Sequence, residues 1–213
     1  VYAEQVEGGL SRLMAIYAST LPKAVGPVRS ARESDLELLR QYDDPTLAFS
    51  GAQGKLLPLI DKAPLKAKPP GKASGAYFRG TDRPAPHNLY LRPARLMRSA
   101  PGASALTNGF RYGAAPAGGR ADTSTTVAYP SARFTFRWSA DRHRWLVSMD
   151  GTPTVTTDGQ PVAPATSRRI AWPTVTMDSR ATVSGSASRM ATSAIACAIS
   201  RNSCERHLMC ATT

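Results

Sequence analysis

Two arginines, Arg29 and Arg32, lie where an extended segment is expected to lead into a helix. Pro27 keeps the preceding residue, Gly26, out of the helical region. A guanidinium group at the start of a helix is unfavourable unless an anion lies nearby, because the helix dipole is positive at that end. We therefore predict that the segment from Gly26 to Asp35 forms a corner that recognises an anion.

Two serines offer alternative starts for this helix. Ser30 is followed three residues later by Glu33, and Ser34 is followed by Glu37 with the same spacing. Either serine can accept a hydrogen bond from the first helical turn while its glutamate bonds back to the serine, as in a capping box. The sequence thus predicts a capped helix directly after the two arginines.

A second group of reactive side chains lies on a loop that contains two prolines. The prolines are Pro84 and Pro86, and His87 and Asn88 come directly after Pro86. Rigid loops hold side-chain geometry well, so we expect this loop to contribute to the same site. His87 is a candidate general acid or base, with Asp35 or Asp82 as the carboxylate that orients it. A structural histidine, bonded to a backbone carbonyl, is the alternative interpretation.

Apolar side chains on both faces predict a buried strand from Leu10 to Ala18. Arg12 interrupts this pattern, so it must pair with a carboxylate such as Glu7 or face a polar site. Guanidinium groups bind carboxylate or phosphate with two parallel hydrogen bonds, which defines the expected ligand chemistry. The predicted ligand-binding residues are Glu7, Arg12, Arg29, Ser30, Arg32, Arg79, Arg83 and Asn88.

The net charge of the 213 residues, +12, favours acidic partners such as nucleic acid, lipid headgroups or wall polymers. A coding bias towards arginine explains the charge equally well. The sequence holds no nucleic-acid recognition motif, so nucleic acid is the least favoured partner. No apolar run approaches the roughly 20 residues of a membrane-spanning helix.

The three cysteines all lie at or after Cys197. Cys204, His207 and Cys210 have a spacing that zinc ligands can adopt, with Cys197 as a fourth thiol. No glycine turn or aromatic residue supports such a site, so we expect no metal and no other cofactor.

The elements that position these residues predict a mixed fold of the α+β or α/β class. Strands and helices in alternation indicate a layered α/β domain over residues 1–105. Alternating aromatic residues then predict a small antiparallel β-rich domain over residues 106–166. Residues 167–213 lack periodicity and are expected to be irregular or disordered, while residues 64–75 are expected to form an exposed basic loop.

Three motifs, in the same order, resemble the YerB-like family of bacterial envelope lipoproteins. They are Glu7-Gly8-Gly9-Leu10-Ser11-Arg12, Val25-Gly26-Pro27-Val28-Arg29-Ser30-Ala31-Arg32 and Ala85-Pro86-His87-Asn88-Leu89-Tyr90. The resemblance covers residues 1 to about 166 and implies an α/β N-terminal domain, a smaller β-rich C-terminal domain and a position outside the cytoplasmic membrane. It also implies that a lipid anchor and the first strand of the domain lie upstream of Val1. The resemblance does not imply any particular biochemical activity.

The sequence departs from the family pattern after Ala165, where a further strand and hairpin are expected. Loss of periodicity and the sudden cysteines lead us to the hypothesis of a reading-frame error, which leaves the β-rich domain incomplete. Resequencing that retains the frame through residues 160–175 would reject this hypothesis.

Taken together, the sequence predicts an extracytoplasmic, envelope-associated binding or regulatory lipoprotein domain that recognises an anionic ligand. That ligand would be a wall polymer or another phosphate or carboxylate group, and the partners would be envelope components or envelope proteins. The first alternative is an envelope hydrolase or transferase that uses His87 as general acid/base. The second is non-specific nucleic-acid binding through the positive charge. Whether the chain is an enzyme stays open at this point.

Overall fold

The strand β2 (Ser11–Tyr17) contributes to two hydrophobic cores at once. The computed structural model describes residues 1–73, 75–102, 105, 122–156, 159–165 and 195–200. Met14 lies in one cluster of buried residues, with Ile16 packed against it, whereas Leu13 and Ala15 lie in the other. Successive side chains of a strand point to opposite faces, so β2 is covered on both sides. The predicted burial of this strand is confirmed.

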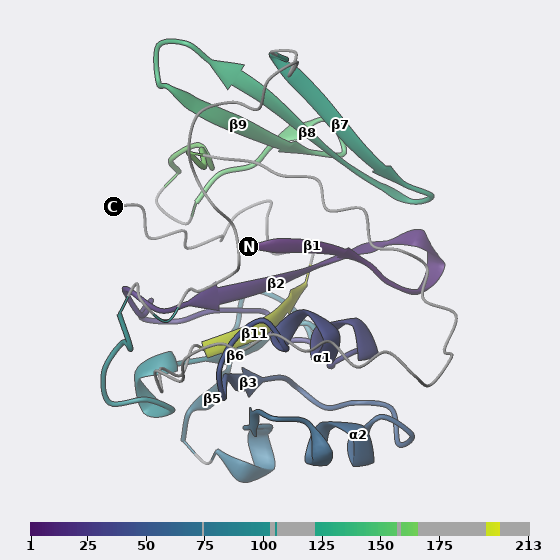
Figure 1. Cartoon of the computed structure of the whole chain (residues 1–213), viewed down its shortest axis with the longest axis vertical. Coiled ribbons are helices and arrows are strands. Elements are labelled where there is room, and N and C mark those ends of the chain that lie inside the picture. The colour runs from purple at the N-terminus through teal and green to yellow at the C-terminus, as the bar shows by residue number, and fades with distance from the viewer. Residues whose placement is uncertain (74, 103–104, 106–121, 157–158, 166–194, 201–213) are drawn as a thin grey trace, which may run out of the picture.

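β2 belongs to a five-stranded sheet with the strand order β1-β2-β11-β3-β4 (Figure 1). β1 (Tyr2–Gln5) pairs with β2 in antiparallel fashion. β11 (Ile195–Ser200) is antiparallel to β2 and parallel to β3 (Thr46–Ala48). β4 (Lys66–Ala67) extends the sheet in parallel beyond β3. The sheet is therefore mixed, and its central position is filled by a strand from far along the chain.

Two of these strands lie where the sequence predicts none. β11 falls in the segment that we expected to be irregular or disordered, and β4 falls in the expected basic loop, so both predictions are wrong for these residues. β4 is too short to carry a period of its own. It is fixed by backbone hydrogen bonds from Lys66 N to Pro45 O and from Lys68 N to Leu47 O. These are non-local contacts, which a local sequence pattern does not reveal.

Two short helices, α1 (Glu33–Leu39) and α2 (Leu57–Lys62), pack against one face of the five-stranded sheet. Leu38, Leu39 and Ile60 belong to the same buried cluster as Met14 of β2. Burying such side chains stabilises the fold by about 1.5–3 kcal/mol each. Single 3-10 turns form at Glu7–Gly9 (η1), Pro70–Lys72 (η2) and Pro93–Arg95 (η3).

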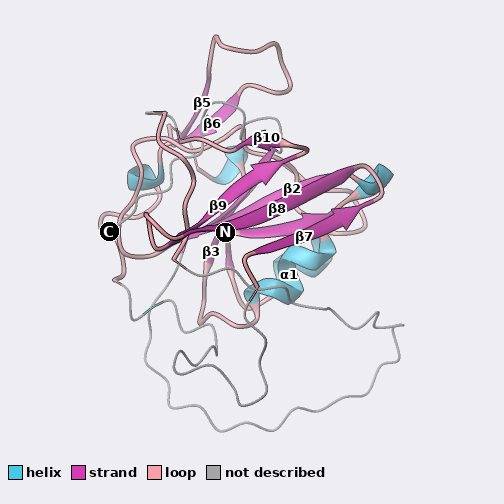
Figure 2. Cartoon of the chain, turned by 90° about the horizontal axis from the view of Figure 1, so that it is seen from above, coloured by secondary structure: helices cyan, strands magenta, loops and turns pink. Residues whose placement is uncertain are grey.

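The other face of β2 contacts a hairpin and a second sheet. The hairpin consists of β5 (Tyr77–Arg79) and β6 (Leu89–Leu91). The second sheet is antiparallel, has the order β10-β9-β8-β7, and lies over β1 and β2 (Figures 1 and 2). One cluster of buried residues joins these parts, and it contains Leu13, Leu91, Phe134 and Met149. The strands of the second sheet are β7 (Ser124–Tyr129), β8 (Ala132–Ser139), β9 (Arg144–Met149) and β10 (Thr152–Pro153).

The described elements therefore form a mixed α and β fold in which antiparallel strands predominate, as the coarser sequence prediction states. The predicted domain boundary, between residues 105 and 106, adjoins residues 106–121, which lie outside the described residues. Among the described residues, no helix is both long enough and apolar enough to cross a bilayer.

Candidate functional site

The segment that carries Arg29 and Arg32 is held between β6 and the end of β3. Backbone hydrogen bonds hold it on both sides, among them Val25 N to Leu91 O, Val28 N to Leu89 O, Ser50 N to Arg29 O and Ala31 N to Gly51 O. The first two attach the segment to β6, and the last two attach it to the residues that follow β3. Both arginines therefore lie beyond the carboxyl end of a parallel strand, the edge at which α/β sheets commonly bind ligands.

Gly26 allows this segment to approach the hairpin closely. Its φ angle is +154°, which favours glycine. A Cβ atom at this position would lie 2.8 Å from Cδ1 of Tyr90 and 2.9 Å from the carbonyl oxygen of Leu89. The absence of a side chain at Gly26 thus brings the arginine segment against the loop that carries His87.

Helix α1 begins with Arg32 as its N-cap, and neither predicted serine cap forms. Asp35, three residues on, accepts a hydrogen bond of 2.6 Å from the backbone N–H of Arg32. Ser34 lies in the first helical turn and donates to Glu4 at 2.7 Å. Because the helix starts at Glu33, Ser30 lies too far before it to act as the N-cap, and Ser34 lies already inside it. The carboxylate of Asp35 therefore accepts the hydrogen bond from the backbone N–H group of Arg32.

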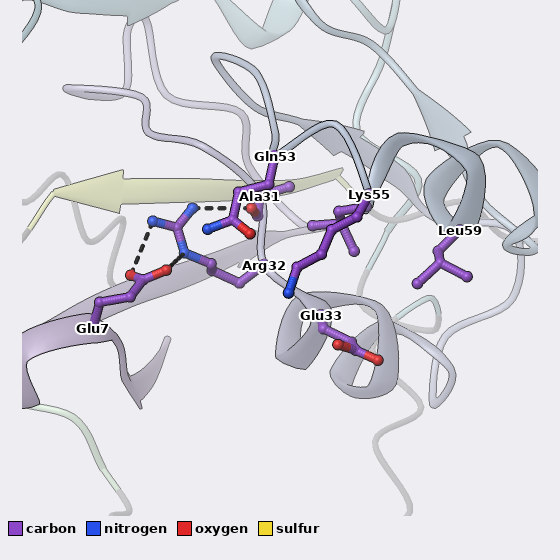
Figure 3. A pocket seen from close by; sticks show the side chains of 8 residues that line it. Glu7, Ala31, Arg32, Glu33, Gln53, Lys55 and Leu59 are labelled. Carbon is purple, nitrogen blue, oxygen red and sulfur yellow. Dashed lines mark hydrogen bonds and ion pairs between the residues drawn. The ribbon is translucent and has the colours of Figure 1, made fainter. Parts of the chain in front are cut away.

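Arg32 forms an ion pair with Glu7 across the start of the helix (Figure 3). Nε of Arg32 lies 2.8 Å from Oε1 of Glu7, and Nη2 donates to Oε2 at 3.0 Å. The remaining nitrogen, Nη1, donates to the carbonyl oxygen of Ala31 at 3.0 Å. This pairing lowers the pKa of Glu7. The charge of Arg32 is therefore paired with a carboxylate within the protein.

The predicted pair between Arg12 and Glu7 is not formed, because Arg32 occupies this carboxylate. Arg12 instead donates from Nη1 to the carbonyl oxygen of Ser30. Burial and then the charge of Arg32 lower the pKa of Arg12, while the charge of Asp35 raises it. Arg12 is thus a half-buried cation that fixes the backbone of the arginine segment.

Arg29 lies close enough to the other two arginines to be affected by their charge. Burial, followed by repulsion from Arg32, lowers its pKa, and Arg29 in turn lowers the pKa of Arg12. Within the described residues, Arg29 has no carboxylate partner. Its side-chain contact is to His87, where Nη1 lies 2.9 Å from Nδ1 of the ring. A guanidinium group can only donate, so Nδ1 accepts and the ring proton lies on Nε2.

Asp35 and Glu4 form a pair of carboxyl groups beneath this surface. Asp35 is 2% exposed, and burial together with the charge of Glu4 raises its pKa to about 7. Burial also raises the pKa of Glu4. Oε1 of Glu4 is buried without a hydrogen bond from any described group, so a proton shared with Asp35 would satisfy it. Asp35 therefore supports the start of the helix and is not bonded to His87.

The remaining predicted residues find their partners on the β5–β6 hairpin. Arg79 donates to Oδ1 of Asn88 at 2.9 Å, and Nδ2 of Asn88 donates to the carbonyl oxygen of Gly80 at 2.8 Å. Asp82 accepts from Tyr90 Oη at 2.6 Å and pairs with Arg83 at 3.4 Å. The Tyr90 hydrogen bond is the main cause of the lowered pKa of Asp82.

The side chain of Tyr90 is partly buried on this hairpin. Burial, followed by Asp82, raises its pKa to about 12. Its ring stacks on Phe78, and Arg92 covers the Phe78 ring at 3.9 Å from the ring centre.

The structure brings together Glu7, Arg12, Arg29, Ser30, Arg32 and Asp35, and it adds His87 through Arg29. Arg79, Arg83, Asp82 and Asn88 form separate contacts within their hairpin. The sequence did not indicate Glu4 as a candidate, because its carboxyl partner, Asp35, lies 31 positions away. The cysteine and histidine residues at positions 204, 207 and 210 lie outside the described residues. No group of acids, histidines and cysteines in the described part of the chain could hold a metal ion.

Comparison with known proteins gives a family and a fold. Residues 1–106 match the N-terminal domain of a family described as protein of unknown function (DUF3048). The crystal structure of YerB protein from Bacillus subtilis is similar, with a TM-score of 0.59 and 20% sequence identity. The likeness covers 76% of this chain and 57% of that chain, so the chain spans little more than half of that YerB structure. No curated protein matches the sequence.

Proposed function

We propose, from the premise that the chain belongs to the YerB-like family of proteins of unknown function, that it binds an anionic group at Arg29. One observation carries the proposal: Arg29 is partly buried beside two other arginines, and no described carboxylate neutralises it. Desolvated like charges are unfavourable without a counter-ion. A bound phosphate or carboxylate would relieve this repulsion.

The roles of the three arginines differ in this proposal. Arg32 is paired with Glu7, and Arg12 donates to the backbone of Ser30, so we assign both the role of supplying positive potential. Arg29 keeps guanidinium N–H groups available beyond the one that it shares with His87. A phosphate or carboxylate would bind Arg29 directly, and the Nε2–H group of His87 would be a second donor on the same surface.

The enzymatic alternative receives less support from the geometry. A general base is usually oriented by a carboxylate, yet the ring of His87 has Arg29 on Nδ1. Asp35 is bonded to the backbone of Arg32, and Asp82 is bonded to Tyr90. Loss of an envelope-substrate turnover on His87→Gln would favour this alternative over simple binding.

Four finer expectations belong to the same proposal. Resemblance to the envelope lipoprotein family supports an extracytoplasmic position, an upstream lipid anchor and an anionic envelope component as partner. The two separate buried clusters on either face of β2 support a layered N-terminal part. Nucleic-acid binding rests on net charge alone and is the weakest alternative.

The test compares anion binding by two variants that each lose one positive charge. Arg29→Ala should weaken binding of a poly(glycerol phosphate) probe, and of inorganic phosphate, by about tenfold or more, because a charge-assisted contact is lost. Arg137→Ala, on an exposed position of β8, should change binding by less than about twofold. Titration calorimetry in low salt measures both. Equal weakening by the two variants would show a net-charge effect and overturn the proposal.

A further inference from the structure

A pocket of about 390 Å³ lies beside the arginine segment, between the start of α1 and the loop that leads into α2. Its lining consists of Glu7, Ala31, Arg32, Glu33, Gln53, Lys55, Leu56 and Leu59. The volume is within the range of small-molecule sites. Arg29 and His87, the proposed anion donors, do not line it, although Glu7 and Arg32 border both places.

The charged groups in this pocket fall into two classes. Glu7 and Arg32 are joined by two short contacts, so they form a closed ion pair in one wall. Lys55 and Glu33 are exposed, and within the described part of the chain neither has an ion-pair or hydrogen-bond partner. Figure 3 shows Lys55 extending from the α2 loop towards the start of α1, where Glu33 lies. Among the residues that the structure describes, the pocket thus presents one unpaired cation, Lys55, and one unpaired carboxylate, Glu33.

Apolar and amide groups complete the lining. Leu59, on α2, is 45% exposed and borders the pocket with Leu56 and Ala31. Gln53 contributes a side-chain amide from the loop that contains Gly51 and Gly54 (Figure 3). A Cβ atom on either glycine would meet nothing within 4 Å, so no side chain packs against these two positions of the loop.

We propose that this pocket binds a small zwitterion with an apolar side chain, namely a free amino acid or the terminus of a short peptide. The ligand carboxylate would accept from Lys55, and its ammonium group would donate to Glu33. The side chain would cover Leu59 and so remove apolar surface from water. A ligand with one charge alone would leave one of the two protein charges without a partner.

The test uses three probes that differ in one charge each: L-leucine, N-acetyl-L-leucine and L-leucinamide. Wild-type protein should bind leucine about tenfold more tightly than either derivative, as measured by titration calorimetry or NMR shifts. Lys55→Met should remove the preference for leucine over leucinamide. Glu33→Gln should remove the preference for leucine over N-acetyl-leucine. Each variant should thus lose one preference and keep the other.

Lys62→Met, on an exposed α2 position outside the pocket, is the matched control and should keep both preferences. Arg29→Ala should also keep them, so this proposal and the anion site can fail separately. A leucyl-leucine dipeptide distinguishes the two sources: tighter binding than leucine indicates a peptide terminus, and weaker binding indicates a free amino acid. Absence of leucine binding, or equal binding of the three probes, would overturn the proposal.

Discussion

A single glycine determines how closely the arginine segment approaches the His87 loop. We expect Gly26→Ala to destabilise the protein, because a methyl group at φ +154° would be strained and would overlap with Leu89 and Tyr90. Backbone strain of this kind costs about 1–3 kcal/mol, and an overlap in a packed site adds a similar amount. Urea denaturation measures the loss.

Gly51→Ala is the matched control for this effect. Gly51 has a φ angle of +157°, but a Cβ atom there would meet nothing within 4 Å. Gly51→Ala therefore introduces the backbone strain without the steric overlap, and it should lower the free energy of unfolding by less than Gly26→Ala does. If the two variants lose equal stability, the close contact with Tyr90 is not what requires glycine at Gly26.

The sequence predicted residue types better than it predicted their partners. Arg12 lies near Arg29 and Arg32 in the structure, although it comes from β2 and not from the expected corner. The partner of Arg32 is Glu7, 25 positions away, and the partner of Arg29 is His87, 58 positions away. Such pairings depend on how strands are ordered in space, which local spacing does not determine.

At the scale of elements, β1 and α1 are joined through the carboxyl groups of Glu4 and Asp35. The groups that face this pair are Ser34 of α1, Arg12 of β2 and the backbone N–H of Arg32. Burial raises the pKa of Asp35 from its usual 3.8 to about 7, so the folded state retains a proton that the unfolded chain releases. The resulting stability is complete below about pH 4 and is lost as the pH rises through 7.

Asp35→Asn should remove most of this pH dependence. Asparagine imitates the protonated acid and retains an oxygen that can accept from Arg32 N. Because each pKa unit corresponds to about 1.4 kcal/mol, we expect the variant to be more stable than wild type by a few kcal/mol at pH 8 and similar at pH 4. Urea denaturation across this range measures the difference.

Asp43→Asn is the control for the charge itself, since Asp43 is exposed. Its stability curve should remain parallel to that of wild type. A parallel curve for Asp35→Asn as well would mean that Asp35 is ionised in the folded protein, and the shared proton would then be excluded.

Elements with a regular pattern of apolar or aromatic residues could be predicted from the sequence, whereas elements without such a pattern were missed. β2, β8 and β9 follow patterns of apolar or aromatic residues, and the structure places strands there. α2 begins at Leu57, with a proline in its first turn. β4 is only two residues long and is held by pairing with β3, so no local pattern could indicate it. β11 pairs with both β2 and β3, and its short apolar run, Ile195 to Ile199, was overlooked in a segment without periodicity.

At the scale of the whole molecule, the two sheets meet where the β7–β8 turn touches η1. Ser131 N donates to the carbonyl oxygen of Gly9 at 2.9 Å, and Tyr129 Oη donates to Ala3 O at 3.0 Å. The shared cluster around Leu13 and Phe134 joins the same parts by apolar packing. This contact connects the second sheet to the strand that carries Arg12 and to the turn that carries Glu7.

Gly9 is the closest point of this contact. A Cβ atom on Gly9 would lie 2.5 Å from Cβ of Pro130, whereas one on Gly8 would meet nothing within 4 Å. The φ angles are alike, +69° and +71°, so alanine is equally strained at both positions. Gly9→Ala should therefore destabilise the protein by about 1–3 kcal/mol more than Gly8→Ala, the excess being the cost of separating the sheets.

The same variants test whether the two sheets are coupled. Gly9→Ala should accelerate hydrogen exchange of the Ser131 amide, which bonds to Gly9, whereas Gly8→Ala should change it less. Pro130→Gly removes the overlapping atoms, so in a double-mutant cycle it should recover much of the loss caused by Gly9→Ala. Additive effects of the two substitutions would show that η1 and the β7–β8 turn do not press on one another in solution. The second sheet would then not help to hold Glu7 against Arg32.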